Sequence, residues 1–211
     1  MMAAWAQPYS SGGFSLSWHR FGLSDLWVED EIGLGLGWRF SARGRSLDTG
    51  LRLRGLMVDV PGYEGPDLSS ASRSYALDLA LAYPLTRHVK LAFIQKSLLK
   101  GEMKLLEDGL SWPAAPREAR LGATYLWRRD LALILEYRFL PGRDGEMLMG
   151  AEVRFFDTFH IRGGTTGTYA TAGFGLRAER WSMDFAFQSR GRLGNTVTLS
   201  FSPLMSPKEA R

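Results

Sequence analysis

The stretch TAGFGLRAERWSMDFAFQSRGRLGNTVTLSFSP, residues 171–203, alternates large apolar side chains with small or polar ones. Near its centre, Trp181, Met183, Phe185 and Phe187 alternate with Ser182, Asp184, Ala186 and Gln188. Because successive side chains of a β-strand point to opposite sides, a strict period of two predicts strands with two different faces. The fold then depends on which face meets water.

The same alternation recurs over residues 13–203 and predicts roughly 12 strands of about ten residues each. We therefore expect a single β-barrel domain over 13–203, with a tail at 204–211. The pattern breaks near 97–117, where apolar spacings of three and four end in prolines, so a long loop and a short helix both remain open.

Residues 1–12 are expected to be an extension ahead of the barrel. Ala4-Trp5-Ala6 has the small-x-small form of a signal-peptidase site, so the extension is interpreted as a possible signal-peptide remnant, with a chance match in an alanine-rich segment as the alternative. No run of about 18 apolar residues occurs, and the sequence predicts no transmembrane helix.

The composition favours β-structure and excludes several classes of function. The 211 residues include 24 glycines and 12% aromatics, which suits tight turns and the aromatic girdles of membrane barrels. Cysteine is absent, which excludes disulfides, thiol catalysis and cysteine-bound metals. The net charge of +4 comes from scattered residues without a basic run, so no nucleic-acid partner is expected.

Alternation alone fits both a soluble β-sandwich and a membrane barrel, but the content of the two faces favours the barrel. The apolar face is built of large residues, while glycine, alanine and charges fill the other, as a narrow lumen requires. The predicted fold is all-β, an antiparallel up-and-down transmembrane β-barrel in the bacterial outer membrane, with membrane lipid as a partner. Its predicted aromatic girdle consists of Trp18, Trp38, Tyr75, Tyr83, Trp127, Tyr137 and Trp181.

Charged residues on the small-residue face are the candidate site. The predicted lumen charges are Arg39, Arg52, Arg54, Asp78, Arg120, Glu136, Arg138, Glu152, Arg154, Arg162, Arg177 and Asp184. Because an unpaired buried charge is costly, a salt-bridged lumen is one interpretation, and a basic pocket for an anionic solute is the other. We expect Glu136–Arg138 and Glu152–Arg154 to form a ladder across a hairpin.

Other motifs carry no chemistry. His19, His88 and His160 lack metal-ligand spacing, and the glycines between Gly33 and Gly37 lie within a strand and not before a helix. We therefore predict no catalytic residue, no metal and no cofactor, and a protein that is not an enzyme.

Three segments carry a resemblance to a known family: PREARLGATYLWRRDLALILEYRF, GAEVRFFDTFHIRGGTTG, and YATAGFGLRAERWSMDFAFQSRGRLGNTVTLSFS, residues 169–202. They resemble the PorV-like outer-membrane barrels of type IX secretion, within the superfamily of long-chain fatty-acid-transporter-like (FadL-like) barrels. The Asn-Pro-Ala-like motif that usually precedes the first strand of that family is missing. The resemblance implies a component or anchor of an envelope assembly that contacts other envelope proteins. A passive channel for small or amphipathic solutes is the alternative, and a soluble β-sandwich binding module is the second.

Overall fold

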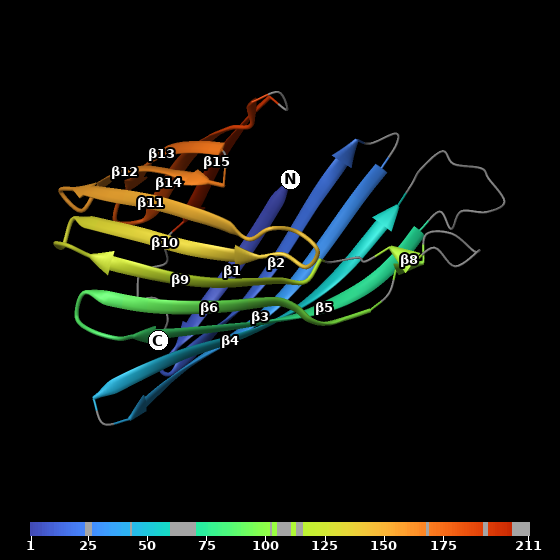
Figure 1. The fold of residues 1–211 in the computed structure, drawn as a ribbon, viewed down its shortest axis with the longest axis horizontal. Coiled ribbons are helices and arrows are strands. Elements are labelled where there is room, and N and C mark those ends of the chain that lie inside the picture. Colours follow the sequence, from blue (N-terminus) through green and yellow to red (C-terminus); the bar gives the residue numbers. More distant parts are fainter. Residues whose placement is uncertain are drawn as a thin grey trace. The chain divides into compact units, whose positions relative to one another are not determined.

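The structure is a computed structural model that describes residues 1–23, 27–42, 44–59, 71–101, 103–104, 111–112, 116–167, 169–191 and 194–203. Among these residues, 13 strands form one sheet in which β6 is followed by β9 and every other neighbour is consecutive, while β7 and β8 form a separate pair. All the registers that are defined are antiparallel (Figure 1). The prediction of an all-β, up-and-down antiparallel fold is confirmed, with one strand more than expected.

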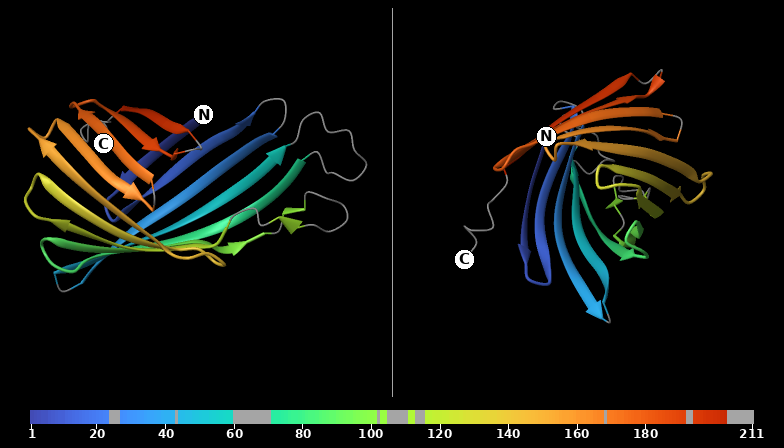
Figure 2. Two further views of the ribbon diagram at one scale, coloured as in Figure 1. Left: turned by 45° about the horizontal axis from the view of Figure 1, so that its top comes forward. Right: turned by 90° about the vertical axis from the view of Figure 1, so that its left-hand side faces the viewer.

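The chain divides into two compact units. The first comprises residues 1–84, 92–120 and 140–143. Its strands are β1 (Met2–Tyr9), β2 (Gly12–Leu23), β3 (Trp27–Ala42), β4 (Arg45–Asp59), β5 (Ala71–Pro84), most of β6 (Val89–Lys100), and the short pair β7 (Met103–Lys104) and β8 (Ser111–Trp112). The strands β1 to β5, blue to cyan in Figure 2, are joined side by side by continuous registers.

The second unit comprises residues 85–91, 121–139 and 144–211. Its strands are most of β9 (Glu118–Leu126), then β10 (Leu131–Phe139), β11 (Glu146–Phe155), β12 (Phe159–Thr166), β13 (Tyr169–Arg177), β14 (Trp181–Ser189) and β15 (Asn195–Pro203). The last three are the strands expected from the stretch 171–203, and their pairing keeps Phe174, Phe185 and Leu199 on one face.

The amino-terminal segment differs from the expectation. Met2–Tyr9 is a strand that pairs with β2 along its whole length, so the expected extension at 1–12 is part of the sheet. Alanines on both faces give this strand little contrast in hydrophobicity, which conceals its period of two. An aromatic contact holds this strand against β2: the Trp5 ring packs edge-on against the Phe14 ring at a centroid distance of 4.9 Å.

The region near 97–117 is not helical where it is described. β6 continues through it to Lys100, and Ser97 takes a left-handed φ of 52° within that strand. The short pair β7 and β8 follows, and no helix occurs among the residues described there. The predicted tail at 204–211 lies outside the described residues.

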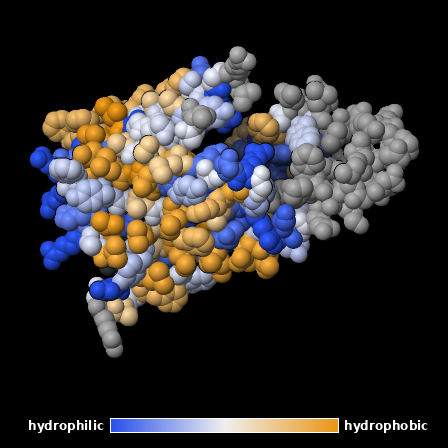
Figure 3. Space-filling model, in the orientation of Figure 1, coloured by the Kyte–Doolittle hydropathy of each residue, from blue (hydrophilic) through white to orange (hydrophobic). Residues whose placement is uncertain are grey.

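The distribution of exposure reverses that of a water-soluble protein. Leu199 and Phe201 are 68% and 66% exposed, and Leu34 is 54% exposed at the middle of β3. Among the described residues the only buried hydrophobic side chains are Val58 and Ala76, whereas Asp78 is 8% exposed. A β-sandwich would bury its apolar face, so this pattern fits a sheet with lipid on one face. Figure 3 shows such hydrophobic side chains spread over the visible surface.

Candidate functional site

Register gathers the predicted lumen charges of the first unit on one face. Arg52 of β4 lies directly opposite Asp78 of β5, and Arg54 lies opposite Gly33 of β3. Glycines and alanines occupy most other positions on this face, so long charged side chains have room to lie flat across neighbouring strands. The candidate site therefore begins as charges set on a floor of small residues.

Arg54 is the centre of the charge network in the first unit. Its Nη1 lies 3.1 Å from Glu31 Oε2, and its Nη2 donates to Asp78 Oδ1 at 2.8 Å. Only 12% of the Arg54 side chain is exposed. A buried guanidinium held between two carboxylates is electrically satisfied, so this arginine is a structural member of the face.

Ser97, which has a left-handed backbone conformation within β6, completes this network. The Ser97 backbone N–H donates to Asp78 Oδ1 at 2.8 Å, and its hydroxyl accepts from Arg54 Nη2 at 3.2 Å. Ser97 is fully buried at a φ of 52°, a conformation that is disfavoured for a residue other than glycine. The hydrogen bonds to Asp78 and Arg54 hold it there.

Arg52 extends the network toward β2. Its Nη2 donates to Glu31 Oε1 and to Ser17 Oγ, both at 2.9 Å. A Cβ at Gly33 would lie 2.7 Å from Arg52 Nε and 2.6 Å from Ser17 Oγ. The glycine at 33 therefore leaves the space in which the Arg52 guanidinium lies.

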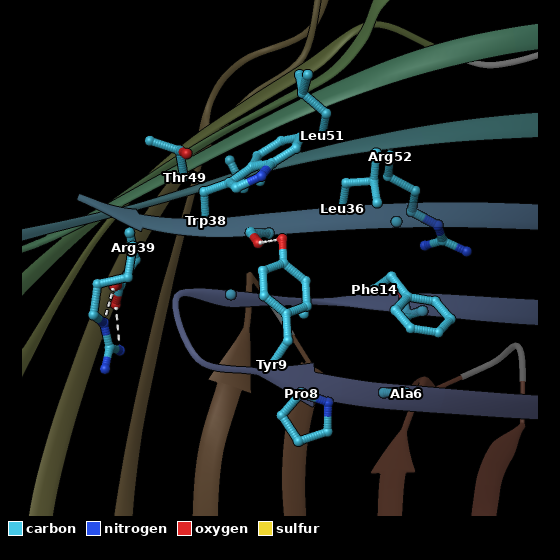
Figure 4. Close-up of a pocket in the computed structure, with 18 of the residues that line it drawn as sticks. Ala6, Pro8, Tyr9, Phe14, Leu36, Trp38, Arg39, Thr49, Leu51 and Arg52 are labelled. Carbon is cyan, nitrogen blue, oxygen red and sulfur yellow. Dashed lines mark hydrogen bonds and ion pairs between the residues drawn. The ribbon is translucent and has the colours of Figure 1, made fainter.

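A hollow of about 870 Å³ opens beside these charges, and its floor is rich in glycine. Its lining includes Gly35, Gly37 and Gly50, where the backbone carries no side chain. At one end the Tyr9 hydroxyl donates to the Gly37 carbonyl at 2.9 Å, and Arg39 pairs with Asp48 at 2.6 Å (Figure 4). The hollow is large enough for a small organic molecule.

The second unit repeats this design on a smaller scale. Arg162 of β12 bridges two carboxylates: its Nε lies 2.7 Å from Glu152 Oε2, and its Nη1 lies 2.6 Å from Asp184 Oδ1. A Cβ at Gly175 would lie 2.5 Å from Asp184 Oδ1, so this glycine makes room for the bridge. His160, which is buried, places Nδ1 3.6 Å from Glu152.

A second hollow of about 480 Å³ lies on the same face of this unit. Gly150, Gly164 and Gly173 line its floor, with Arg162 and Asp184 at its side. Both units thus combine small residues with charges that neutralise one another.

The expected ladder across β10 and β11 is wrong in register. Glu136 lies opposite Leu148, and Arg138 lies opposite Glu146, with which it forms an ion pair. Glu152 lies opposite Ala132 and finds its partner in Arg162 on the next strand. The turn between the two strands sets a pairing that the hydrophobic pattern alone does not specify.

The remaining predicted charges lie toward the ends of strands. Arg120 pairs with Glu118, which also lies 3.6 Å from Lys96. Arg154 lies 3.7 Å from Glu152, the carboxylate that also pairs with Arg162. Arg177 is the exposed last residue of β13.

Sequence reasoning missed most of the acidic partners. Glu31, Asp48, Glu118 and Glu146 were not among the predicted charges, although each pairs with one of them. Glu31 has the same parity as Gly33 and Gly35, so the period of two could have identified it. Ser97 had no such signal, because its role depends on its backbone conformation.

The predicted girdle aromatics lie on the apolar face near strand ends. In the first unit Trp38 and Tyr83 lie toward the ends joined by short turns, and Trp18 and Tyr75 lie toward the opposite ends. In the second unit Trp127 and Trp181 flank short turns, and Tyr137 lies near the other end of β10. This distribution fits two interfacial belts, and the girdle role remains a prediction.

No group of three or more potential metal ligands occurs among the described residues. Within the same residues, no helix is long and apolar enough to cross a membrane. The predicted lack of a cofactor is not tested by these observations.

Comparisons with known proteins place the fold. No protein-family model and no curated protein sequence matches the chain. The crystal structure of the toluene transporter TbuX of Ralstonia pickettii matches with a TM-score of 0.66 at 11% identity, over 97% of this chain and 81% of TbuX. The toluene transporter TodX of Pseudomonas putida matches with a TM-score of 0.58 at 9% identity, over 89% of this chain and 76% of TodX.

A third similar structure is the monoaromatic hydrocarbon channel CymD. It has a TM-score of 0.58 at 11% identity, and the match covers 96% of this chain and 79% of CymD. At identities of 9–11% these likenesses show the fold, which agrees with the resemblance to FadL-like barrels. The chain has the fold of the FadL-like outer-membrane barrels.

Proposed function

We propose that the chain is an outer-membrane channel for small hydrophobic or amphipathic solutes. The observation that carries this proposal is the hollow itself, whose lining combines Gly35 and Gly50 with the apolar residues Phe14, Leu36 and Leu51. The three similar structures are transporters or channels for toluene or monoaromatic hydrocarbons, which supports a transport role over the assembly role.

The ion pairs beside the hollow favour a neutral solute. Arg39, Arg52 and Arg54 each contact a carboxylate of the chain at 3.1 Å or less. An anionic solute would have to displace an internal carboxylate, which would then be left without its partner. A neutral ring or chain would need only apolar contact and room above the glycines. The basic pocket for a fatty-acid carboxylate is therefore the weaker interpretation.

A blocking substitution tests the channel. Gly50 lines the hollow, whereas Gly55 of the same strand has the opposite parity and is not part of its lining. We expect G50W to reduce the initial uptake of labelled toluene to the level of cells without the protein, and G55W to leave it unchanged. The measurement is uptake by bacteria that express each variant and lack another hydrocarbon channel, with folded protein quantified in the outer membrane.

Equal uptake by G50W and the unmodified chain would contradict the proposal. Loss of uptake in both variants would point to general damage, and the amount of folded protein in the membrane would show whether this is the cause.

The second candidate is a component or anchor of an envelope secretion assembly, as the PorV-like resemblance implies. The mutually paired charges favour it, because such a face would be closed to ions. Cross-linking in intact cells, followed by identification of the attached proteins, tests this role. A stable envelope partner together with no toluene uptake would favour the anchor. For either role we propose no catalytic residue.

A further inference from the structure

The short turns at one end of the second unit carry exposed charges of both signs. Three connections join antiparallel neighbours at the same end of the sheet: residues 127–130 between β9 and β10, 156–158 between β11 and β12, and 178–180 between β13 and β14. Backbone hydrogen bonds join them in a row: Arg154 N–H donates to the Asp130 carbonyl, and Arg177 N–H to the Thr158 carbonyl, both at 2.7 Å. The side chains of these three turns therefore form one continuous surface.

The outer turns of this surface carry charges of both signs. Arg128 and Arg129 are followed by Asp130 in the first turn, and Arg180 is preceded by Glu179 in the third. All five side chains are exposed, and no hydrogen bond or ion pair joins them to another described residue. The charges of the small-residue face behave differently, because Arg54 and Arg162 bridge carboxylates there.

The middle turn presents an apolar residue in an unfavourable conformation. Phe156 and Asp157 both have left-handed φ angles, of 52° and 56°, and Phe156 is 96% exposed. Turns of this kind favour asparagine or glycine, and an exposed phenylalanine gains no burial within the chain to offset the strain. A surrounding apolar phase would supply that burial.

The apolar face next to Phe156 is continuous with the lipid-facing side of the sheet. Phe155 and Phe159 lie across the hairpin from one another, and the ring of Phe159 lies 6.3 Å from that of Phe174. Trp127 and Trp181 stand at the two neighbouring turns. Aromatic residues of this kind mark the depth of the lipid headgroups, with charged side chains just beyond them.

We propose that these three turns bind the headgroup of an ethanolamine phospholipid. The guanidiniums of Arg129 and Arg180 donate to the phosphate, and the carboxylates of Asp130 and Glu179 accept hydrogen bonds from the primary ammonium. Phe156 lies among the upper acyl chains. A purely anionic headgroup would meet the carboxylates unfavourably, and a choline headgroup has no N–H to donate. The proposal depends on the membrane location of the chain and is independent of what the channel transports.

The test measures which lipids stay with the full-length protein. The chain is folded in vesicles of mixed ethanolamine, choline and glycerol phospholipids, extracted gently, and examined by native mass spectrometry for retained lipid. We expect the protein to retain about five times more ethanolamine lipid than choline lipid. In R129Q/R180Q the amount of retained ethanolamine lipid should fall about fivefold for each arginine removed. D130N/E179Q should abolish the preference for ethanolamine over choline.

Controls separate this result from general effects of charge and from failure to fold. R143Q/R190Q removes the same charge from connections at the opposite ends of the strands and should leave retention unchanged. A shift in gel mobility on heating, recorded in choline vesicles, shows that each variant is folded before lipids are compared. Absence of folding in any vesicle would count against the membrane location itself. Retention of glycerol lipid at or above ethanolamine lipid would overturn the proposal, as would equal retention by R129Q/R180Q and the unmodified chain.

The absence of cysteine permits a second, independent measurement. A spin label at F156C should collide more often with lipid-soluble oxygen than with an aqueous nickel chelate, and a label at R143C should show the reverse. A label at 156 that meets only the aqueous chelate would overturn the placement of Phe156 in lipid.

Discussion

Adjacent glycines in β12 show how strongly a single position depends on its neighbours. A Cβ at Gly164 would lie 2.4 Å from the Met149 carbonyl oxygen, which belongs to the backbone and cannot move aside easily. At Gly163 nothing lies within 4 Å of such a Cβ. Both residues look alike in the sequence, and only the approach of β11 distinguishes them.

This difference predicts opposite effects of the same substitution. We expect G164A to lower the free energy of unfolding by about 1–3 kcal/mol, because the strands must separate. We expect G163A to raise it by about 0.5–1 kcal/mol through a lower entropy of the unfolded chain. Urea unfolding in vesicles, followed by tryptophan fluorescence, measures both. Equal effects would show that β11 and β12 are not as closely paired as described.

The two kinds of arginine on the small-residue face make a second prediction at the residue scale. R54Q should cost about 3 kcal/mol, because it leaves the buried Asp78 carboxylate without the guanidinium that pairs with it and leaves Glu31 with Arg52 alone. R39Q should have a much smaller effect on the free energy of unfolding, because Arg39 is 63% exposed and pairs with one aspartate in contact with solvent. The same unfolding experiment compares them, and a larger loss for R39Q would place the main network elsewhere.

At the scale of the element, a strand of this sheet presents one exposed apolar face and one face of small residues and charges. β15 shows this clearly, since Leu199 lies opposite Phe185 on the apolar face and Thr198 lies opposite Ala186 on the other. Both are near the middle of a strand of nine residues, so they are matched in depth.

We expect L199R to cost about 2–4 kcal/mol in a bilayer, because its charge would lie in hydrocarbon. T198R should cost less, since it enters the hollow beside Asp184. Folding yield in vesicles at increasing urea concentration checks the order. If L199R were harmless, the apolar face would not be in contact with lipid.

At the scale of the whole molecule, the exposed apolar face predicts dependence on detergent or lipid. The chain should remain dispersed only in detergent, give a β-rich circular dichroism spectrum, and migrate differently on a denaturing gel before and after boiling. A protein that stayed monomeric in buffer and showed no shift would instead support the soluble β-sandwich.

The presence of most strands and the identity of their two faces follow from the amino-acid sequence alone, because a period of two is a local property of each strand. The same pattern shows small residues alternating with large ones such as Leu34 and Leu199. This was enough to predict a barrel and a face that holds the charges. It placed Arg52, Arg54 and Asp78 on that face without a structure.

The pairing of those charges was decided by tertiary structure. Register determines that Arg138 faces Glu146 and that Arg162 bridges Glu152 and Asp184, and register is set by turns whose geometry involves only a few residues. The strand Met2–Tyr9 likewise became visible only through its pairing with β2. The alternation of residue types shows which face of the sheet each side chain lies on. The distance between side chains on different strands depends on the register of those strands, which the local pattern does not contain.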